Sequence, residues 1–298
     1  MSLKDVKHLV PATSSSATFL ATLGPSGTFS ELAAREVLRL PQFTKAPPTI
    51  SFYSSLSRTL QAIPEQAGIA VVPLENIVEG IVSPVVDSFL KQPLQIIAEV
   101  AIPVRFSVVA NHPQPNVIFA QFVAQGQCSD WLSQHDIEVI STASNTAALA
   151  QLQATTQAAA AIIPEHLLAA VEPNTSAADW AWVEHDVTDY AHNVTRFVAV
   201  QQPQPLAAPD HSIRYKSSIV IVDDADHPGL LLEHLQAFAV HQINLLALVS
   251  RPTGQRFGHY HFFIEFEGHL QHPRVQAALS AIELRNQVIQ LGSYEFSS

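Results

Sequence analysis

Short apolar runs separated by stretches of helical spacing occupy the first part of the chain. The strands that these runs predict lie at residues 19–23, 50–52, 68–72, 117–120, 137–140 and 159–163. The helices predicted between them lie at residues 28–40, 54–63, 126–134, 146–154 and 165–170. Strands that alternate with helices of this length are typical of an α/β fold, in which crossover helices join the strands.

The pattern changes after the apolar run at residues 194–200. Residues 201–209 are polar and rich in proline, without hydrophobic periodicity, which is typical of a linker between domains. The strands and helices predicted beyond the linker follow in the order β-α-β-β-α-β, at residues 217–222, 229–240, 244–250, 259–266, 273–283 and 288–294. Two helices and four strands in this order indicate a ferredoxin-like α+β domain.

Composition narrows the kind of protein that this chain can be. Hydrophobic residues make up 47% of its 298 positions, so each domain is expected to have a packed core. The net charge of −11 disfavours nucleic acid and anionic membranes as partners, because both attract basic surfaces. The single cysteine excludes an internal disulfide, and residues 1–16 lack the apolar core of a signal peptide. A soluble, cytoplasmic protein with a flexible leader and no membrane span is therefore expected.

Three polar segments could carry chemistry, and each has an ordinary structural explanation as well. The turn Gly24-Pro25-Ser26-Gly27-Thr28-Phe29-Ser30 precedes a predicted helix whose free N–H groups favour an anion, or it simply joins strand to helix. Glu75-Asn76 follows the carboxyl end of a predicted strand, where open α/β sheets bind ligands, or it braces a turn. In Asn193-Val194-Thr195-Arg196-Phe197 a hydroxyl could donate and a guanidinium could hold a carboxylate, but in isolation a strand edge with a surface arginine explains the segment better.

Histidine and cysteine do not provide a convincing metal or nucleophile site. His259 and His261 would share one strand face, with His269 and His272 nearby, yet no cysteine or clustered carboxylate accompanies them. Cys128 lies in a helical pattern without an identifiable base, which favours a buried packing residue over a nucleophile. No metal site is expected.

The order of the polar segments is similar to the signature of the prephenate dehydratase family. The matching segments are Gly24-Pro25-x-Gly27-Thr28-Phe29-Ser30, Pro73-x-Glu75-Asn76-x-x-x-Gly80 and Asn193-x-Thr195-Arg196-Phe197. The C-terminal part resembles the ACT regulatory domain of that family through Gly229-Leu230-Leu231-x-x-x-Leu235 and Ser250-Arg251-Pro252. The likeness extends over residues 19–294.

The resemblance implies a two-lobed catalytic domain, like a type II periplasmic binding protein, followed by a ferredoxin-like ACT domain. The catalytic domain is expected at residues 18–202, with lobe one at 18–99 and 193–202 and lobe two at 100–192. The linker would then occupy residues 203–214 and the ACT domain residues 215–298. The active site would lie between the lobes, with Thr195 and Arg196 facing the turn at residues 24–30.

The implied reaction is the decarboxylation and dehydration of prephenate to phenylpyruvate in L-phenylalanine biosynthesis, catalysed by a carbon–oxygen lyase. Formation of the aromatic ring drives this reaction, so no cofactor or metal is expected. Thr195 would donate a hydrogen bond to the departing hydroxyl, and Arg196 would hold a carboxylate or orient the hinge. The other candidates for catalysis or substrate binding are polar or belong to the matching segments: Glu75, Asn76, Gly27, Thr28, Phe29, Ser30, Gln127, Ser144, Asn145 and Phe197.

The ACT resemblance implies feedback regulation by phenylalanine and a homodimer or homotetramer formed through the ACT domains. The residues expected to frame the phenylalanine site are Gly229, Leu230, Leu231, Asn244, Leu245, Ser250 and Arg251. The chain departs from the family pattern at Ile77 and Ala120, where serine is common, and at Val249, where the regulatory motif has glutamate. Two alternatives stay open: arogenate as the substrate, and a catalytically impaired homologue that acts as a phenylalanine sensor.

Overall fold

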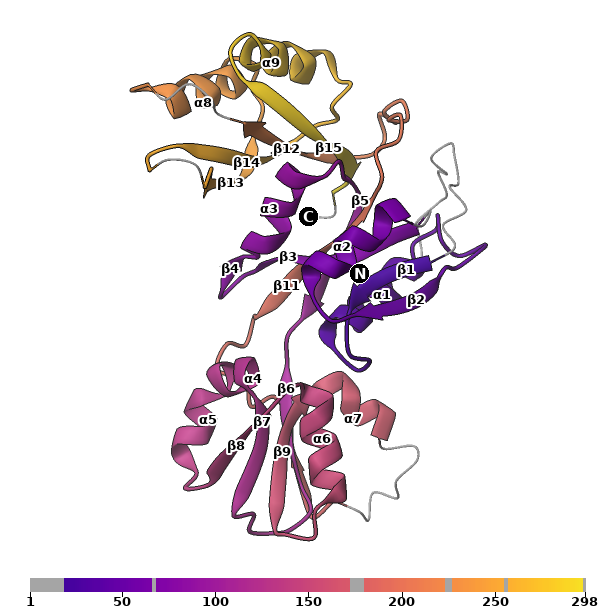
Figure 1. Ribbon diagram of the computed structural model, residues 1–298, viewed down its shortest axis with the longest axis vertical. Helices are drawn as coiled ribbons and strands as arrows, with labels where there is room; N and C mark the ends of the chain where they lie inside the picture. Colours follow the sequence, from indigo (N-terminus) through magenta and orange to yellow (C-terminus); the bar gives the residue numbers. More distant parts are fainter. Residues whose placement is uncertain (1–18, 66–67, 172–179, 223–226, 255–256, 297–298) are drawn as a thin grey trace.

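The computed structural model describes residues 19–65, 68–171, 180–222, 227–254 and 257–296, so the leader expected at residues 1–16 lies outside the described residues. Within these ranges the chain forms three sheets that follow one another along the long axis of the molecule (Figure 1). Lobe one lies in the middle, with lobe two on one side and the C-terminal domain on the other.

Lobe one is built on a sheet with the strand order β2-β1-β3-β11-β5. Its strands are β1 (Phe19–Leu23), β2 (Thr49–Tyr53), β3 (Gly68–Asn76), β4 (Gly80–Ile81, paired with β3), β5 (Gln95–Pro103) and β11 (Val194–Gln201). Its helices are α1 (Phe29–Leu38), α2 (Leu56–Glu65) and α3 (Ser83–Lys91). Strand β11 runs antiparallel to both of its neighbours, β3 and β5. The last strand of the catalytic domain therefore lies inside its first sheet.

The two faces of β11 pack against different parts of the molecule. Phe197 and Ala199 lie in the hydrophobic cluster beneath α1. Val198 and Val200 lie in a second cluster, which includes α2, α3 and residues of the C-terminal domain. This division follows from the strand itself, because successive side chains of a strand point to opposite faces of the sheet.

Lobe two is built on a sheet with the strand order β10-β6-β9-β7-β8. Its strands are β6 (Phe106–Ala110), β7 (Val117–Gln121), β8 (Glu138–Thr142), β9 (Ala159–Pro164) and β10 (Trp182–Glu184). Its helices are α4 (Phe122–Gln127), α5 (Ser129–Gln134), α6 (Asn145–Ala154) and α7 (Glu165–Val171). The chain enters lobe two between Pro103 and Phe106, somewhat beyond the expected boundary near Val100, because β5 pairs with β11 as far as Pro103.

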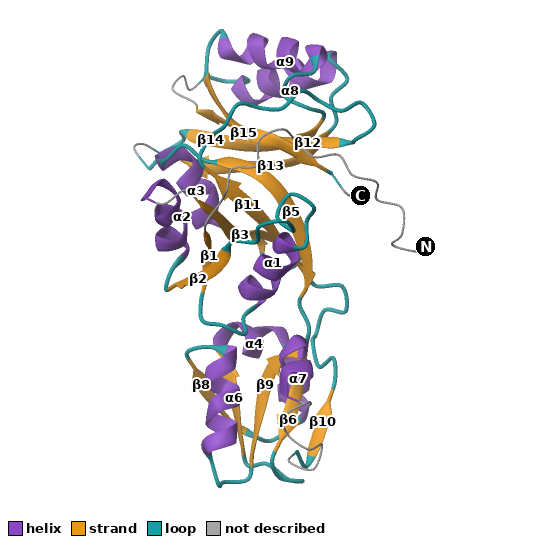
Figure 2. Cartoon of the chain, turned by 90° about the vertical axis from the view of Figure 1, so that its right-hand side faces the viewer, coloured by secondary structure: helices purple, strands orange, loops and turns teal. Residues whose placement is uncertain are grey.

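The C-terminal domain has the predicted β-α-β-β-α-β order, and its ferredoxin-like fold is confirmed. Its elements are β12 (Tyr215–Val222), α8 (Leu230–Val240), β13 (Leu245–Pro252), β14 (Tyr260–Glu267), α9 (Pro273–Glu283) and β15 (Gln287–Glu295). The strand order is β13-β14-β12-β15 and every pair is antiparallel. Both helices cover the same face of the sheet, and the other face lies towards lobe one (Figure 2).

The face of this sheet towards lobe one is not exposed to water, because it shares a hydrophobic cluster with the catalytic domain. Phe89 of α3 stacks on Phe263 of β14, with 6.2 Å between the ring centroids. Val220 and Leu291 join the same cluster. Arg251 of β13 adds a two-pronged ion pair to Asp87 of α3, with N–O distances of 2.8 and 2.9 Å. Lobe one and the C-terminal domain are therefore packed as one unit.

The structure differs from the predicted elements around lobe two and α3. Helix α3 was not predicted, and the apolar stretch at residues 94–110 contains two strands, β5 and β6. The helix predicted at residues 126–134 is two helices that meet at Cys128, whose φ of −126° is not helical. The side chain of Gln121 caps α4, and the carboxylate of Asp189, distant in sequence, accepts hydrogen bonds from the first N–H groups of α5.

The contact between β15 and β5 can be tested at Gly292. A Cβ atom added there would lie 2.4 Å from the carbonyl oxygen of Ile96, whereas one added at Gly258, which also has a positive φ, would meet nothing within 4 Å. Because neither glycine conformation suits alanine, the pair isolates the cost of the clash. Gly292→Ala is expected to destabilise the protein by about 1–3 kcal/mol more than Gly258→Ala in denaturant unfolding. Equal unfolding midpoints for the two variants would contradict this packing.

Candidate active site

The clearest polar arrangement between the lobes is centred on Asn76, the last residue of β3. The side-chain oxygen of Asn76 accepts hydrogen bonds from the backbone N–H groups of Val78 and Glu79, each at 2.9 Å. These two bonds fix which side-chain atom is oxygen and which is nitrogen. The side-chain nitrogen donates to the hydroxyl of Thr195 at 2.9 Å and to the amide oxygen of Asn193 at 2.8 Å. Since the hydroxyl of Thr195 accepts from Asn76, its own proton is left to donate elsewhere.

The hydrogen bonds continue from lobe one into lobe two. Asn193 donates to the side-chain oxygen of Gln127, at the end of α4, over 3.0 Å. Gln127 donates in turn to the carboxylate of Glu79 at 2.8 Å. Asn76, Gln127 and Asn193 are all buried, so each of these bonds forms where water does not compete freely. The structure thus brings Thr195, Asn76 and Gln127 together.

Sequence reasoning missed Asn193 and Glu79 as members of this chain of hydrogen bonds. Asn193 is a specified position of a segment that matches the family signature, which was the signal that could have identified it, whereas Glu79 falls at an unspecified position of its segment. Their partners, however, come from different elements. The bond between Asn76 and Asn193 joins residues 117 positions apart, and the bond between Gln127 and Glu79 joins residues 48 positions apart.

The turn before α1 is partly occupied by a carboxylate of the chain itself. Glu31 accepts hydrogen bonds from the hydroxyl of Ser26 and the backbone N–H of Gly27, both at 2.6 Å. Burial alone would raise the pKa of the Glu31 carboxyl, but these hydrogen bonds and Arg35 lower it, so the group is ionised at neutral pH. The N–H of Gly27, expected to bind a substrate carboxylate, is therefore already used. Thr28 caps α1 by accepting from the N–H of Glu31.

The same turn packs across the boundary between the lobes. The carbonyl oxygen of Gly27 lies 3.1 Å from Nε2 of His166 in lobe two. Phe29 makes edge-to-face contacts with Phe106 and His166, at centroid distances of 5.5 and 5.2 Å. A Cβ atom added to Gly27 would lie 2.4 Å from the methyl group of Thr146, in the first turn of α6. The N-terminal ends of α1 and α6 therefore meet at this boundary.

Two of the remaining candidates lie at the start of α6. Ser144 caps the helix by accepting from the N–H of Ala147 at 3.0 Å. The side-chain oxygen of Asn145 is buried and has no hydrogen-bond partner within the described residues. A buried amide without a partner at a helix N-terminus is suited to a polar ligand. Ser30, by contrast, is buried in lobe one, where its carbonyl accepts from the hydroxyl of Thr22.

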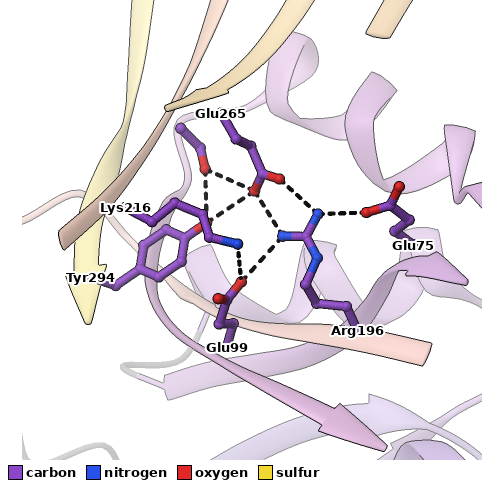
Figure 3. Close-up of polar contacts among 7 residues, drawn as sticks. Glu75, Glu99, Arg196, Lys216, Glu265 and Tyr294 are labelled. Carbon is purple, nitrogen blue, oxygen red and sulfur yellow. Dashed lines mark hydrogen bonds and ion pairs between the residues drawn. The ribbon is translucent and has the colours of Figure 1, made fainter. Parts of the chain in front are cut away.

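Arg196 does not face the boundary between the lobes with Thr195, contrary to the expectation from the sequence. Its guanidinium binds both carboxylate oxygens of Glu265 of the C-terminal domain, at 2.8 and 2.7 Å (Figure 3). It also donates to Glu75 at 2.8 Å and to Glu99 at 3.2 Å. The reason is the alternation of side chains along β11, which sends consecutive residues to opposite faces. Glu75 therefore belongs to this cluster as well, and Phe197 is buried beneath α1 rather than lining a substrate site.

The carboxylate of Glu265 is the most deeply buried charge of this cluster. Only 1% of its side chain is exposed, and the hydroxyls of Ser218 and Tyr294 donate to it at 3.2 and 3.1 Å. Burial alone would raise the pKa of Glu265, but Arg196 and Lys216 lower it. Burial and the charge of Glu265 raise the pKa of Tyr294 well above its ordinary value, so that side chain stays neutral and donates.

The lowered pKa of Glu265 makes domain packing dependent on pH in a defined direction. A carboxyl whose pKa is lowered in the packed state stabilises that state at pH values above its ordinary pKa, near 4.5. The contribution disappears as the pH falls through the lowered pKa. At neutral pH the ion pair with Arg196 is therefore fully formed.

Comparison with known proteins identifies the family. The sequence profile of the prephenate dehydratase family matches residues 20–205, and that of the ACT domain matches residues 218–284. The prephenate dehydratase of Amycolatopsis methanolica is 34% identical over 92% of this chain and 88% of its own length. The chain belongs to the prephenate dehydratase family. It is a lyase, with a two-lobed α/β catalytic domain and an ACT domain.

Solved structures of this family have the same architecture. The prephenate dehydratase of Arthrobacter aurescens, in complex with L-Phe, has a TM-score of 0.78 at 31% identity and covers 93% of this chain and 90% of its own. The enzyme of Staphylococcus aureus also has a TM-score of 0.78, at 26% identity, covering 93% of this chain and 100% of its own. No helix among the described residues of this dehydratase is long and apolar enough to cross a membrane.

The predicted phenylalanine-binding residues fall at two opposite ends of the ACT sheet. Ser250 of β13 and Ile221 of β12 both pair with Phe262 of β14, so they lie at the same end of the sheet. Helix α8, with Gly229, Leu230 and Leu231 at its start, follows β12 from this end. Leu245, preceded by Asn244, lies instead at the level of Ser217, at the start of β12. Ser250 lies five positions beyond Leu245 along the extended strand β13, so one ACT domain does not bring the two groups together. Arg251 is engaged with Asp87 of α3.

Cys128 of this dehydratase is buried, and burial together with the nearby Asp189 raises the pKa of its thiol to about 12. It is therefore not a thiolate nucleophile at neutral pH.

The state of Cys128 can be measured because it is the single cysteine of the chain. The native protein at pH 8 is expected to react with a disulfide reagent at least about 10³-fold more slowly than the denatured protein, whose thiol has an ordinary pKa. The measurement is the release of the coloured thiol of the reagent, with and without denaturant. Similar rates in the two conditions would contradict a buried, protonated thiol.

Proposed function

We propose that this dehydratase converts prephenate into phenylpyruvate, and that Thr195 donates a hydrogen bond to the departing hydroxyl. The observation that carries the proposal is the 2.9 Å bond from Asn76 to the hydroxyl oxygen of Thr195. It leaves the hydroxyl proton directed away from Asn76, and the pair lies where the two lobes meet. A cytoplasmic location, expected from the sequence, goes with this biosynthetic role.

The chemistry requires little from the protein beyond positioning and one good donor. As the bond from the ring to its carboxylate breaks and CO2 leaves, the electron pair enters the ring and expels the hydroxyl group from the opposite carbon. The leaving oxygen becomes more negative in the transition state, so a donor aimed at it stabilises that state more than the ground state. A threonine hydroxyl is too weak an acid to transfer its proton fully, so water or the medium completes protonation of the leaving group.

The substrate carboxylates are expected to lie near the start of α6 and the amide groups of the inter-lobe hydrogen bonds. Support comes from the helix N-terminus itself and from the hydroxyl of Ser144, whose oxygen accepts from the N–H of Ala147 and whose proton can donate. The unpartnered side-chain oxygen of Asn145 accepts hydrogen bonds, so it suits a donor such as a substrate hydroxyl rather than a carboxylate. Gln127 reaches from lobe two to Asn193 and Glu79 of lobe one, so it would respond when the lobes close around a ligand. Arg196 takes no direct part, because three carboxylates already hold it.

Two departures from the family pattern bear on the alternative of an impaired homologue. Ala120 is fully buried in the core of lobe two, and Ile77 is 69% exposed in the turn after β3. Neither residue belongs to the hydrogen bonds that join Asn76, Asn193 and Thr195. The polar arrangement around Thr195 therefore forms without a serine at either position, which favours an active enzyme.

Substitution of Thr195 tests the proposed role directly. Thr195→Val keeps the shape of the side chain but removes the donor, so kcat for phenylpyruvate formation is expected to fall about 10²–10³-fold with little change in KM. Thr195→Ser, which keeps a hydroxyl, is the matched control and should retain most of the activity. A Thr195→Val enzyme as active as the wild type would remove Thr195 from the mechanism.

The same assay separates the remaining alternatives for substrate and activity. Arogenate carries an amine where prephenate carries a keto group, and this group takes no part in the reaction of the ring. Both compounds are therefore assayed side by side. Turnover of arogenate alone would make the enzyme an arogenate dehydratase. Turnover of neither would favour a phenylalanine-binding sensor.

We also propose that two copies of the ACT domain assemble the phenylalanine site. The separation of Gly229 from Asn244 along the sheet supports this. In a two-fold symmetric dimer with antiparallel ACT domains, the Gly229 end of one copy would lie beside the Asn244 end of the other. Strand β13 lies at the edge of the sheet order and is open to pairing with a partner. Feedback inhibition would then require the homodimer.

Mixed dimers test this arrangement. Gly229→Ala and Asn244→Ala are each expected to abolish phenylalanine binding in calorimetry, because each removes one half of both sites. A dimer that combines one subunit of each variant retains one intact site and should bind one phenylalanine. Differently tagged subunits, expressed together, allow its purification. A mixed dimer that binds none, or a monomer that binds phenylalanine, would overturn the shared site.

A further inference from the structure

The catalytic threonine and the domain boundary are one residue apart on β11. In the pairing of β11 with β3, Thr195 lies opposite Asn76 and Arg196 lies opposite Glu75. The first pair faces the inter-lobe site, and the second faces the ACT sheet. Any shift or rotation of this short segment therefore moves the Thr195 hydroxyl and the Arg196 guanidinium together.

The pairing of β11 with β3 is irregular next to Arg196, although the same residues pair regularly with β5. The register with β3 shifts between Arg196 and Phe197, where β3 has an extra residue, Leu74, that no β11 residue faces. A bulge of this kind interrupts the ladder and redirects the neighbouring side chains. Side-chain contacts of Arg196 therefore add to the backbone pairing in setting the position of the strand beside Thr195, the second residue of β11.

The strongest of these contacts comes from the ACT domain. Both nitrogens of the Arg196 fork meet both oxygens of Glu265, a geometry that fixes the plane of the guanidinium as well as its distance. Glu265 is itself fixed, because the hydroxyls of Ser218 and Tyr294 hold its Oε1 atom inside the ACT sheet. Arg196 is thus bound to a rigid group of the neighbouring domain.

We propose that Glu265 of the ACT domain is a positioning residue for catalysis: through Arg196 it sets the position of β11 and thereby aims the hydroxyl of Thr195. The inference rests on the role proposed above for Thr195. It connects the regulatory domain directly to the catalytic strand. A displacement of β14 would move Arg196 through its bonds to Glu265 and would thereby change the orientation of the Thr195 hydroxyl.

Loss of Glu265 should not simply separate the domains. The ion pair between Arg251 and Asp87 and the stacking of Phe89 on Phe263 also join the ACT domain to α3, and neither contact involves β11. Removing the charge of Glu265 therefore releases Arg196 while most of the domain contact persists. Asp87→Asn provides the converse case, since it weakens the domain contact but leaves the pair between Glu265 and Arg196 in place.

The first measurement is the steady-state kinetics of the full-length enzyme. Glu265→Gln and Arg196→Lys are each expected to lower kcat on the order of 10-fold while KM stays within about twofold, because a misaimed donor weakens the transition state more than substrate binding. Glu267→Gln is the matched control: Glu267 lies two residues along the same strand but pairs with Arg214, the residue just before β12, at 3.3 Å. Asp87→Asn and Glu267→Gln are both expected to retain the kcat of the wild type.

The combined variant distinguishes a shared role from two separate ones. If Glu265 acts through Arg196, the double variant Glu265→Gln with Arg196→Lys loses no more kcat than the more impaired single variant. Losses that multiply would show that the two residues act independently, and would overturn the proposal. A loss of kcat in Asp87→Asn equal to that of Glu265→Gln would also overturn it, since domain contact alone would then explain the effect.

A second measurement does not depend on turnover. The methyl resonance of Thr195, assigned by its absence in Thr195→Val, reports the environment of that side chain in NMR spectra of threonine-labelled protein. It is expected to shift in Glu265→Gln and Arg196→Lys but not in Glu267→Gln. An unmoved resonance would overturn the positioning role, and so would a moved resonance accompanied by wild-type kcat.

The two measurements also separate failure of this inference from failure of the proposed function. If the wild type forms no phenylpyruvate from prephenate, the proposed function fails, and the methyl resonance alone then decides whether Glu265 positions Thr195. If the wild type is active and Thr195→Val is impaired, the kinetics of Glu265→Gln decide it.

Discussion

The insertion of β11 between β3 and β5 is the constraint on which the rest of this enzyme depends. The chain leaves lobe one along β5 and returns along β11, so the two crossings to lobe two lie side by side. The same strand then supplies Thr195 to the inter-lobe site, Phe197 and Ala199 to the core beneath α1, and Arg196 and Val198 to the side of the ACT domain. One strand therefore joins both lobes, the site and the regulatory domain.

Much of this arrangement was predictable from the sequence. Hydrophobic periodicity identified most helices and strands and the ferredoxin-like order of the last domain. The ordered motifs predicted that Thr195 and Asn76 lie near each other, and the family resemblance added Gln127 as a further candidate. Helix α3 was missed, and so was the break at Cys128. That break depends on a capping carboxylate, Asp189, which lies 60 residues from Ser129 and is not visible in the local pattern.

The orientation of Arg196 was within reach of sequence reasoning and was nevertheless predicted wrongly. Two consecutive residues of a strand cannot both face the same crevice, so a strand containing Thr195 in the site sends Arg196 away from it. What the sequence could not provide was the partner. Glu265 lies 69 residues along the chain, in a strand whose pattern gave no reason to single out one buried carboxylate.

The commitment of Arg196 to the domain boundary also fits the chemistry of the reaction. The ring carboxylate of prephenate loses its charge as CO2 departs, so a cation paired with it would stabilise the ground state more than the transition state and slow the reaction. A site that holds this carboxylate through neutral amides, hydroxyls and a helix N-terminus avoids that penalty while still orienting the group. Three carboxylates around Arg196 neutralise its charge and hold the guanidinium at the boundary with the ACT domain. In a protein of net charge −11, the arginine that follows Thr195 along the chain thus pairs with three carboxylates of the chain itself.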